Sequence, residues 1–201
     1  MKKISTFLFI LLVGMVNCSL AEIRSGSVEV SGYIGPLIGL DKTQFKDFPV
    51  SIDPKTGVYS GFRLGYNFTP YIGTEFSWGW SSANCSVIFD GASVKPKIDT
   101  SQFLFQSNFV LHFLPKSHIV PFLTTGIGLV YLRGGGIEDF YEMMDESRTR
   151  FSPNWGGGIK IFITKDIIFR GDLRFSNFGL GDIFEDRITT LEISGGLAYS
   201  F

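Results

Sequence analysis

The sequence predicts an all-β fold, an eight-stranded antiparallel up-and-down transmembrane β-barrel. Three observations lead to this fold class. Apolar and polar residues alternate with a period of two along most of the chain after residue 21, and this is the pattern of β-strands. The connections between the predicted strands alternate between short and long. The sequence also stops in the middle of such an alternation, in the segment SGGLAYSF, on the large hydrophobic residue Phe201.

The first 21 residues have the pattern of a secretory signal peptide. Lys2 and Lys3 give a positively charged start, residues 7–16 form an apolar run, and Ser19-Leu20-Ala21 is a cleavage site of small residues. The apolar run is shorter than the roughly 20 residues of a membrane-spanning helix. We therefore expect this segment, residues 1–21, to direct export and to be removed.

The remaining residues, 22–201, are expected to form one barrel domain. An alternative is a lipoprotein anchored through Cys18, although Asn17 stands where a small residue normally precedes the lipidated cysteine. After cleavage the chain holds 16 basic and 19 acidic residues, a net charge of about −3. This charge disfavours a nucleic-acid partner, because nucleic acids bind basic surfaces.

The cysteine and histidine content excludes several kinds of site. Cys18 leaves with the signal peptide, so Cys85 has no partner for an intrachain disulfide. One cysteine and two histidines, His112 and His118, do not make a metal-binding cluster. We predict no metal and no cofactor.

Eight segments carry the strand alternation, and no segment shows sustained helical periodicity. The predicted strands are 26–38, 57–68, 71–80, 100–113, 119–132, 153–163, 167–178 and 188–201. One segment, 137–144, is at most a short helical turn inside a loop.

The connections between these strands differ in length in a regular way. The short ones are 69–70, 114–118 and 164–166, and the long ones are about 40–56, 81–99, 133–152 and 179–187. If sequential strands pair antiparallel, all short turns lie at one end and all long loops at the other. Outer-membrane barrels have this asymmetry, with short periplasmic turns and longer extracellular loops. Both chain ends then lie on the side of the short turns.

One face of the predicted strands is apolar and aromatic throughout. Its members include Phe62, Leu64, Tyr66, Phe76, Trp78, Trp80, Phe103, Phe105, Phe109, Leu123, Ile127, Trp155, Ile159, Phe169, Leu173, Leu197, Tyr199 and Phe201. We find no charged residue on this face within the strands. Contact with lipid explains this, because Lys or Arg at the bilayer midplane costs about 2–4 kcal/mol.

The opposite face carries the polar and charged residues. It includes Gln102, Gln106 and Asn108. Its charged members, which we predict to form a network inside the barrel, are Glu29, Arg63, Glu75, Lys160, Arg170, Asp172, Arg174 and Glu192. An eight-stranded barrel has an interior just wide enough for side chains. Four positive and four negative charges would balance there, which matters because an unpaired buried charge is strongly unfavourable.

A soluble barrel with aromatic residues inside and charges outside would show the same alternation. Aromatic residues near the strand ends, the loop asymmetry and the signal peptide together with the terminal Phe201 favour the membrane interpretation. Alternation alone does not distinguish the two faces.

The last four strands resemble a known family. Val120-Pro121-Phe122 followed by Gly126-Ile127-Gly128-Leu129 is similar to a strand of OmpA-like outer-membrane β-barrel domain proteins. The stretch WGGGIKIFITKDIIFRGDLRFSNF resembles the family's glycine-rich strand, tight turn and arginine-bearing strand. SGGLAYSF resembles the C-terminal signal that the barrel-assembly machinery binds, with Leu197, Tyr199 and Phe201 as the signal residues. The resemblance implies a Gram-negative outer membrane and, as partners, periplasmic chaperones, the barrel-assembly machinery and outer-membrane lipid including lipopolysaccharide.

A second resemblance concerns catalysis. Residues 174–180, RFSNFGL, are similar to the His-x-Ser-Asn-x-Gly-Leu segment of outer-membrane lipid A deacylases, with Ser176 at the position of the serine. Arg174 stands at the position of the general base and does not accept a proton at neutral pH. His112 and His118 are expected at the other end of the barrel. We predict no catalytic residue and rank this enzyme last.

The long loops are the expected place of any specific function. The loop 133–152 holds several charged residues: Glu138, Asp139, Glu142, Asp145, Glu146, Arg148 and Arg150. One hypothesis is that they contact a divalent cation or lipopolysaccharide, and the default alternative is a solvated loop without a ligand. We expect a monomer with a structural or surface-interaction role. The alternative from another class is a narrow, porin-like channel for ions or small solutes.

Overall fold

The computed structural model of the chain describes residues 22–41, 43–44, 50–54, 56–89, 97–134, 149–179 and 187–201. The predicted signal peptide, 1–21, and the possible helical turn within 137–144 lie outside this part. Among the described residues, no helix is long and apolar enough to cross a bilayer.

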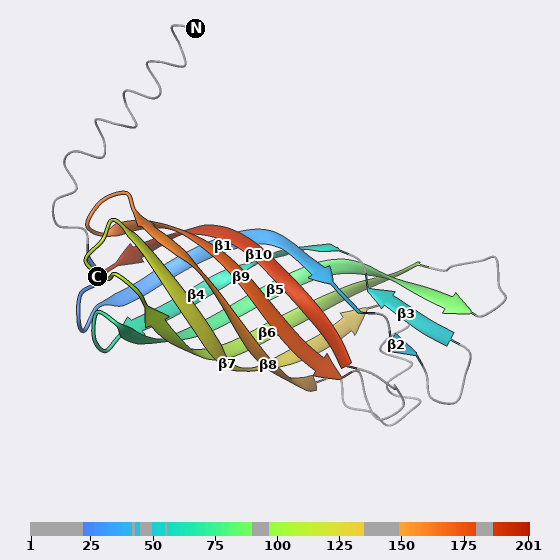
Figure 1. Ribbon diagram of the computed structural model, residues 1–201. Coiled ribbons are helices and arrows are strands. Elements are labelled where there is room, and N and C mark those ends of the chain that lie inside the picture. Colours follow the sequence, from blue (N-terminus) through green and yellow to red (C-terminus); the bar gives the residue numbers. More distant parts are fainter. Residues whose placement is uncertain are drawn as a thin grey trace, which may run out of the picture.

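The described part of the chain forms ten antiparallel strands, and eight of them close into a barrel (Figure 1). The strands are β1 (Val28–Gly39), β2 (Thr43–Gln44), β3 (Val50–Pro54), β4 (Gly57–Asn67), β5 (Ile72–Phe89), β6 (Lys97–His112), β7 (Ile119–Gly134), β8 (Thr149–Phe162), β9 (Ile167–Gly179) and β10 (Arg187–Ser200). Around the barrel each strand pairs with the next, and β10 pairs with β1 to close the ring. The predicted fold class and all eight predicted barrel strands are confirmed.

Two predicted loops are wrong in part. The segment 40–56 contains β2 and β3, and the segment 81–99 contains the outer parts of β5 and β6. Beyond Ser82, β5 no longer pairs with β4 and pairs instead with β3, in the register Cys85 to Pro54. Because these strand ends extend past the barrel, they lack the two contrasting environments that produce a clear alternation. Cys85 therefore lies in β5, whereas the sequence interpretation placed it in a loop.

The short turns are stabilised by hydroxyl side chains. Thr69 Oγ1 accepts the backbone N–H groups of Tyr71 and Ile72, at 3.2 and 3.0 Å. Thr164 Oγ1 accepts those of Asp166 and Ile167 in the same way, at 3.3 and 2.9 Å. Such side-chain turns need few residues, which explains why these connections are short. As Figure 1 shows, the three turns and the C-terminus lie at one end of the barrel, which we call the short-turn end.

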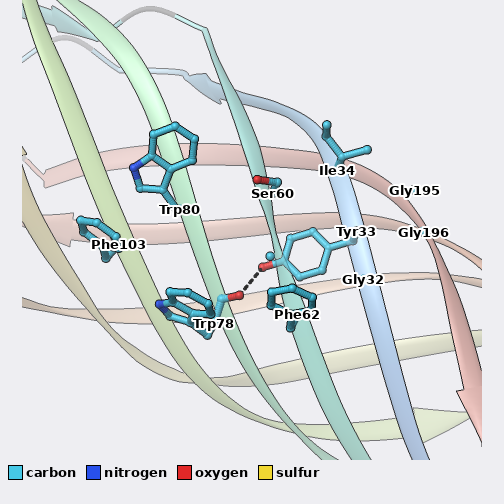
Figure 2. A pocket seen from close by; sticks show the side chains of 11 residues that line it. Gly32, Tyr33, Ile34, Ser60, Phe62, Trp78, Trp80, Phe103, Gly195 and Gly196 are labelled. Atoms are coloured by element: carbon cyan, nitrogen blue, oxygen red, sulfur yellow. Dashed lines mark hydrogen bonds between the residues drawn. The ribbon is translucent and has the colours of Figure 1, made fainter.

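The two faces of the strands are occupied as predicted. The large exposed hydrophobic side chains, among them Phe62, Phe76, Trp78, Trp80 and Trp155, point outward from the barrel. Figure 2 shows part of this outer face over β1, β4 and β5. The charged residues of the opposite parity point inward and are buried. The alternation therefore places the apolar side chains on the outside of the barrel, where they suit contact with an apolar environment.

The interior contains one apolar cluster towards each end. At the short-turn end, Ile23 from the segment before β1 packs with Val120, Phe162, Ile168 and Ala198. At the opposite end, called the long-loop end, the cluster consists of Tyr33, Leu37, Tyr59, Leu104, Val130, Leu132, Phe178 and Ile188. The buried charges lie between these two layers.

Candidate functional site

The barrel interior holds all eight charged residues that the sequence placed there. Each is at most 5% exposed, and the structure arranges them in two groups along the barrel. A larger group of six lies in the middle, and a pair lies nearer the short-turn end. The sequence did not show which partners would meet, because the partners come from strands that are far apart in the chain.

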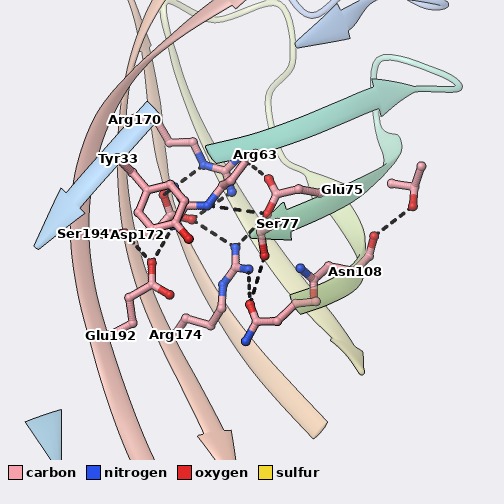
Figure 3. A network of polar contacts seen from close by, with 12 residues as sticks. Tyr33, Arg63, Glu75, Ser77, Asn108, Arg170, Asp172, Arg174, Glu192 and Ser194 are labelled. Carbon is pink, nitrogen blue, oxygen red and sulfur yellow. Dashed lines mark hydrogen bonds and ion pairs between the residues drawn. The ribbon is translucent and has the colours of Figure 1, made fainter. Parts of the chain in front are cut away.

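The larger group consists of three arginines and three carboxylates (Figure 3). Glu75 on β5 accepts hydrogen bonds from Arg170 and Arg174, both on β9, the latter at 2.9 Å. Asp172 lies between these arginines on β9 and accepts from Arg170 at 2.8 and 2.9 Å. The carboxylate of Glu75 thus joins β5 to the opposite wall of the barrel.

Arg63 on β4 completes this group. Its guanidinium donates to Asp172 at 3.2 Å and to Glu192 on β10 at 2.6 Å. The same guanidinium lies 3.7 Å from the centre of the Tyr33 ring on β1, in the geometry of a cation–π contact. Arg63 therefore links four strands, β1, β4, β9 and β10, across the seam where the barrel closes.

The second group lies around Lys160 on β8. Its Nζ donates to both carboxylate oxygens of Glu29 on β1, at 2.7 and 2.9 Å, and lies 3.0 Å from His112 Nε2. The amide of Asn67 donates to the same carboxylate at 2.8 Å. This group joins β1, β4, β6 and β8 close to the short turns.

The charge balance of the interior explains how so many ions are buried. Each isolated ion would lose several kcal/mol of hydration on burial, and paired, hydrogen-bonded ions recover much of that loss. Fork-shaped guanidinium groups suit this role because one arginine contacts two carboxylates at once. The arrangement links the strands of the barrel to one another, since its charged groups bind one another.

Several contributors were not among the predicted network residues, including Gln106, which accepts from Arg174 at 3.0 Å. His112, Asn67 and Ser194 belong to the inward parity of their strands, and that parity is the signal that identifies them. Ser194 donates to Glu192 at 2.5 Å and accepts from Arg63 at 2.9 Å. Histidine, asparagine and serine are common inside any barrel. Inward parity alone therefore did not distinguish these network residues from residues that only fill the interior.

The serine of the deacylase-like segment lies in this interior. Ser176 is 4% exposed and accepts a hydrogen bond from Gln106 at 3.1 Å. Arg174, at the position of the general base, is bound to Glu75 and Gln106. His112 lies at the opposite end of the barrel wall, at the last residue of β6. Ser176 thus has no proton acceptor of the deacylase type beside it among the described residues.

Metal and loop sites have little support in the described part of the chain. No group of three or more His, Cys, Asp and Glu residues is placed there to hold a metal ion. Most of the loop proposed for a cation or lipopolysaccharide contact, residues 135–148, lies outside the described residues. That contact stays a prediction.

Comparison with known proteins identifies the family. A family model described as the outer membrane protein beta-barrel domain matches residues 8–201. The chain belongs to this family. The protein is therefore an outer-membrane β-barrel protein of the Gram-negative envelope, as the resemblance in its last four strands implied.

Relatives and solved structures agree with this assignment. A 25 kDa outer-membrane immunogenic protein of Brucella abortus biovar 1 is 27% identical over 180 residues, covering 85% of this chain and 78% of the relative. The outer-membrane protein OprG from Pseudomonas aeruginosa has the same fold, with a TM-score of 0.66 at 10% identity over 92% of this chain and 99% of OprG. Neisserial surface protein A matches with a TM-score of 0.61 at 14% identity, over 90% of this chain and all of that protein.

Proposed function

We propose that this outer-membrane barrel is a non-catalytic anchor that presents a recognition surface at its long-loop end. In outer-membrane barrels the short turns are periplasmic and the long loops extracellular, which directs the long-loop end outward from the cell. The buried ion network supports the anchoring part of the proposal. It holds the strands together without forming a reactive centre.

The observation that carries the recognition part is a sheet that extends beyond the barrel. We call it the projecting sheet: β2, β3 and the outer parts of β5 and β6, residues 83–89 and 97–99. Within it, β5 pairs with β6 on one side and β3 on the other, and β3 pairs with β2. Figure 1 shows this sheet reaching past the other strand ends. The ring of barrel strands closes without it, because β4 pairs with β5 below the projecting part and β10 pairs with β1.

The names of the Brucella relatives are compatible with a surface role. They describe outer-membrane immunogenic proteins, and that property concerns those proteins. For this chain, an ordered sheet outside the membrane supports recognition better than unstructured loops would, because an ordered surface loses less entropy on binding.

The test removes the outer parts of β5 and β6, which leaves β3 without its pairing partner and keeps the barrel strands intact. Ala83 and Thr100 face each other across β5 and β6, so residues 84–99 can be replaced by Asn-Gly, the preferred two-residue hairpin turn. The matched control replaces residues 180–186 by the same turn, because Gly179 and Arg187 also face each other. Both variants should show heat-modifiable gel migration, which reports a folded barrel.

The readout is adherence of Gram-negative cells expressing each form to cultured epithelial cells and to immobilised matrix proteins. We expect the variant without residues 84–99 to lose adherence at least fivefold, to the level of the empty vector, and the control to keep it. Equal adherence of both forms and the vector would contradict the proposal. If the variant without residues 84–99 also restored detergent resistance to cells that lack the protein, the role of the barrel would be purely structural.

A further inference from the structure

The lipid-facing surface contains a groove that lies outside the charged groups of the ion network, although Tyr33, whose ring packs on Arg63, is among its lining residues. It lies over β1, β4, β5, β6 and β10 and has a volume of about 790 Å³, which is within the range of about 300–1,000 Å³ typical of small-molecule sites. We call it the outer groove. Gly32, Ser60 and Gly195 form its floor, and aromatic side chains rise beside them (Figure 2).

The floor is low because bulky residues alternate with small ones across neighbouring strands. Ser60 lies between Trp80 on β5 and Ile34 on β1, and Gly32 lies between Phe62 on β4 and Leu197 on β10. All four flanking side chains are exposed on the outer face. The hollow therefore comes from a glycine and a serine in adjacent rows of an otherwise bulky surface.

Packing within the barrel does not require glycine at the floor. A Cβ atom on Gly32 would meet no heavy atom within 4 Å, and one on Gly195 would first meet Phe169 at 3.8 Å. Gly35 differs, because a Cβ there would collide with the backbone carbonyl of Ile193. Glycine in a strand interior weakens the strand and often marks a bulge, a tight bend, or a place where a ligand or another backbone approaches closely.

The aromatic side of the groove is pre-organised. The rings of Phe62 and Trp78 stack with centroids 6.1 Å apart and planes 17° from parallel, and Trp78 also stacks on Phe105 at 6.5 Å. A stacked wall keeps its shape when a neighbour is added, so a ligand would not have to order these side chains.

We propose that the outer groove binds one acyl chain of a membrane lipid. The groove is continuous with the lipid-facing surface of an outer-membrane protein, so hydrocarbon is the medium that reaches it. Its lining offers apolar contacts and few polar groups, which disfavours water because a bound water needs two to four polar partners. An acyl chain lying over Gly32 and Ser60 gains the close contacts that an unfilled hollow would lose.

The test uses the tryptophan residues as reporters in vesicles. The protein is reconstituted in phosphatidylcholine with increasing fractions of the same lipid brominated in its acyl chains, since bromine quenches tryptophan fluorescence on contact. The variant Trp155→Phe keeps Trp78 and Trp80 at the groove. The variant Trp78→Phe/Trp80→Phe keeps Trp155, which faces lipid on β8 outside the groove.

Each reporter is combined with a filled groove and with a matched control. Gly32→Leu/Ser60→Leu fills the floor, and Ser60→Leu alone serves if the double variant fails to show heat-modifiable migration. Gly171→Leu adds the same side chain to β9 outside the groove, where a Cβ would meet only Ile159 Cγ1, at 3.9 Å. We expect filling to lower the quenching constant of Trp78 and Trp80 at least twofold, and the control to leave it unchanged.

Quenching of Trp155 should be the same in all three forms. Unchanged quenching of Trp78 and Trp80 after filling would overturn the proposal. Weak quenching of these two residues in the unfilled protein, together with a cross-linked dimer that filling abolishes, would also overturn it and assign the groove to a second copy of the chain.

Discussion

Glu75 has three guanidinium groups around one carboxylate. Arg170 and Arg174 donate to its two oxygens, and Arg63 Nε lies 3.8 Å from Oε1. These arginines come from β4 and β9, while Glu75 belongs to β5. The carboxylate of Glu75 therefore interacts with arginines from both sides of the lumen. The Glu75 side chain is only 2% exposed.

Neutralising this carboxylate should destabilise the barrel strongly. Glu75→Gln leaves buried arginine charge uncompensated, and breaking a buried ion pair in this way costs about 3–5 kcal/mol. The measurement is the free energy of unfolding in urea, with the protein folded in detergent or vesicles.

A matched substitution at a surface pair provides the control. Asp166→Asn removes the carboxylate that binds Arg24, a pair whose side chains are 26% and 44% exposed, and exposed pairs contribute about 0–1 kcal/mol. Equal losses of stability in the two variants would show that the interior network does not stabilise the barrel through its charges.

At the scale of one element, β10 combines three roles. It pairs with β9 on one side and β1 on the other, which closes the barrel. Its inward residues Glu192 and Ser194 bind Arg63. Its outward residues face lipid, and at its end the rings of Tyr199 and Phe201 meet edge to face at 4.8 Å.

The aromatic side chain of Phe201 is largely exposed in the folded barrel. It is 68% exposed, and the hydrogen bond to Val28 of β1 comes from its backbone N–H, at 2.9 Å. If Phe201 is the assembly signal, Phe201→Ala should reduce the assembled fraction in the outer membrane several-fold and leave export unchanged. Membrane fractionation with the gel shift measures this fraction.

Phe113→Ala is the control, because Phe113 is also an exposed aromatic residue at the short-turn end, 42% exposed. It should assemble at the wild-type level. Equal assembly of both variants would show that Phe201 is only a structural residue of the closing strand.

The whole molecule is layered along the barrel axis. The cluster around Ile23 occupies the short-turn end, the ion network the middle, and the cluster around Tyr59 and Leu104 the long-loop end. An ion that crosses the lumen would pass two apolar layers and displace paired charges between them. Hydrophobic constrictions of this kind block conduction by excluding water.

We therefore expect no reproducible conductance steps from the purified protein in planar bilayers, in contrast to the channel hypothesis. The control is the heat-modifiable gel shift of the same preparation, which shows that the tested protein is folded. Discrete steps that scale with the amount of folded protein would revive the channel as a function.

The sequence by itself determined the eight barrel strands, their faces and the ends of the barrel, but not β2 and β3. Side chains alternate across a strand by local geometry, so residues such as Arg174 and Phe175 are assigned to opposite faces without knowledge of their neighbours. Eight strands with alternating turn lengths then lead to one closed antiparallel ring. The outer parts of β5 and β6 could not be predicted in this way, because outside the barrel no contrast between lipid and interior shapes the pattern.

Only the tertiary structure decided which residues meet. Lys160 and Glu29 are 131 positions apart in the chain, and their contact depends on strand register and on the curvature of the closed sheet. The outer groove arises in the same way, since Gly32 and Ser60 become neighbours only when β1 pairs with β4. Local alternation sets the direction of a side chain, whereas its partners follow from the summed geometry of all the strands around the ring.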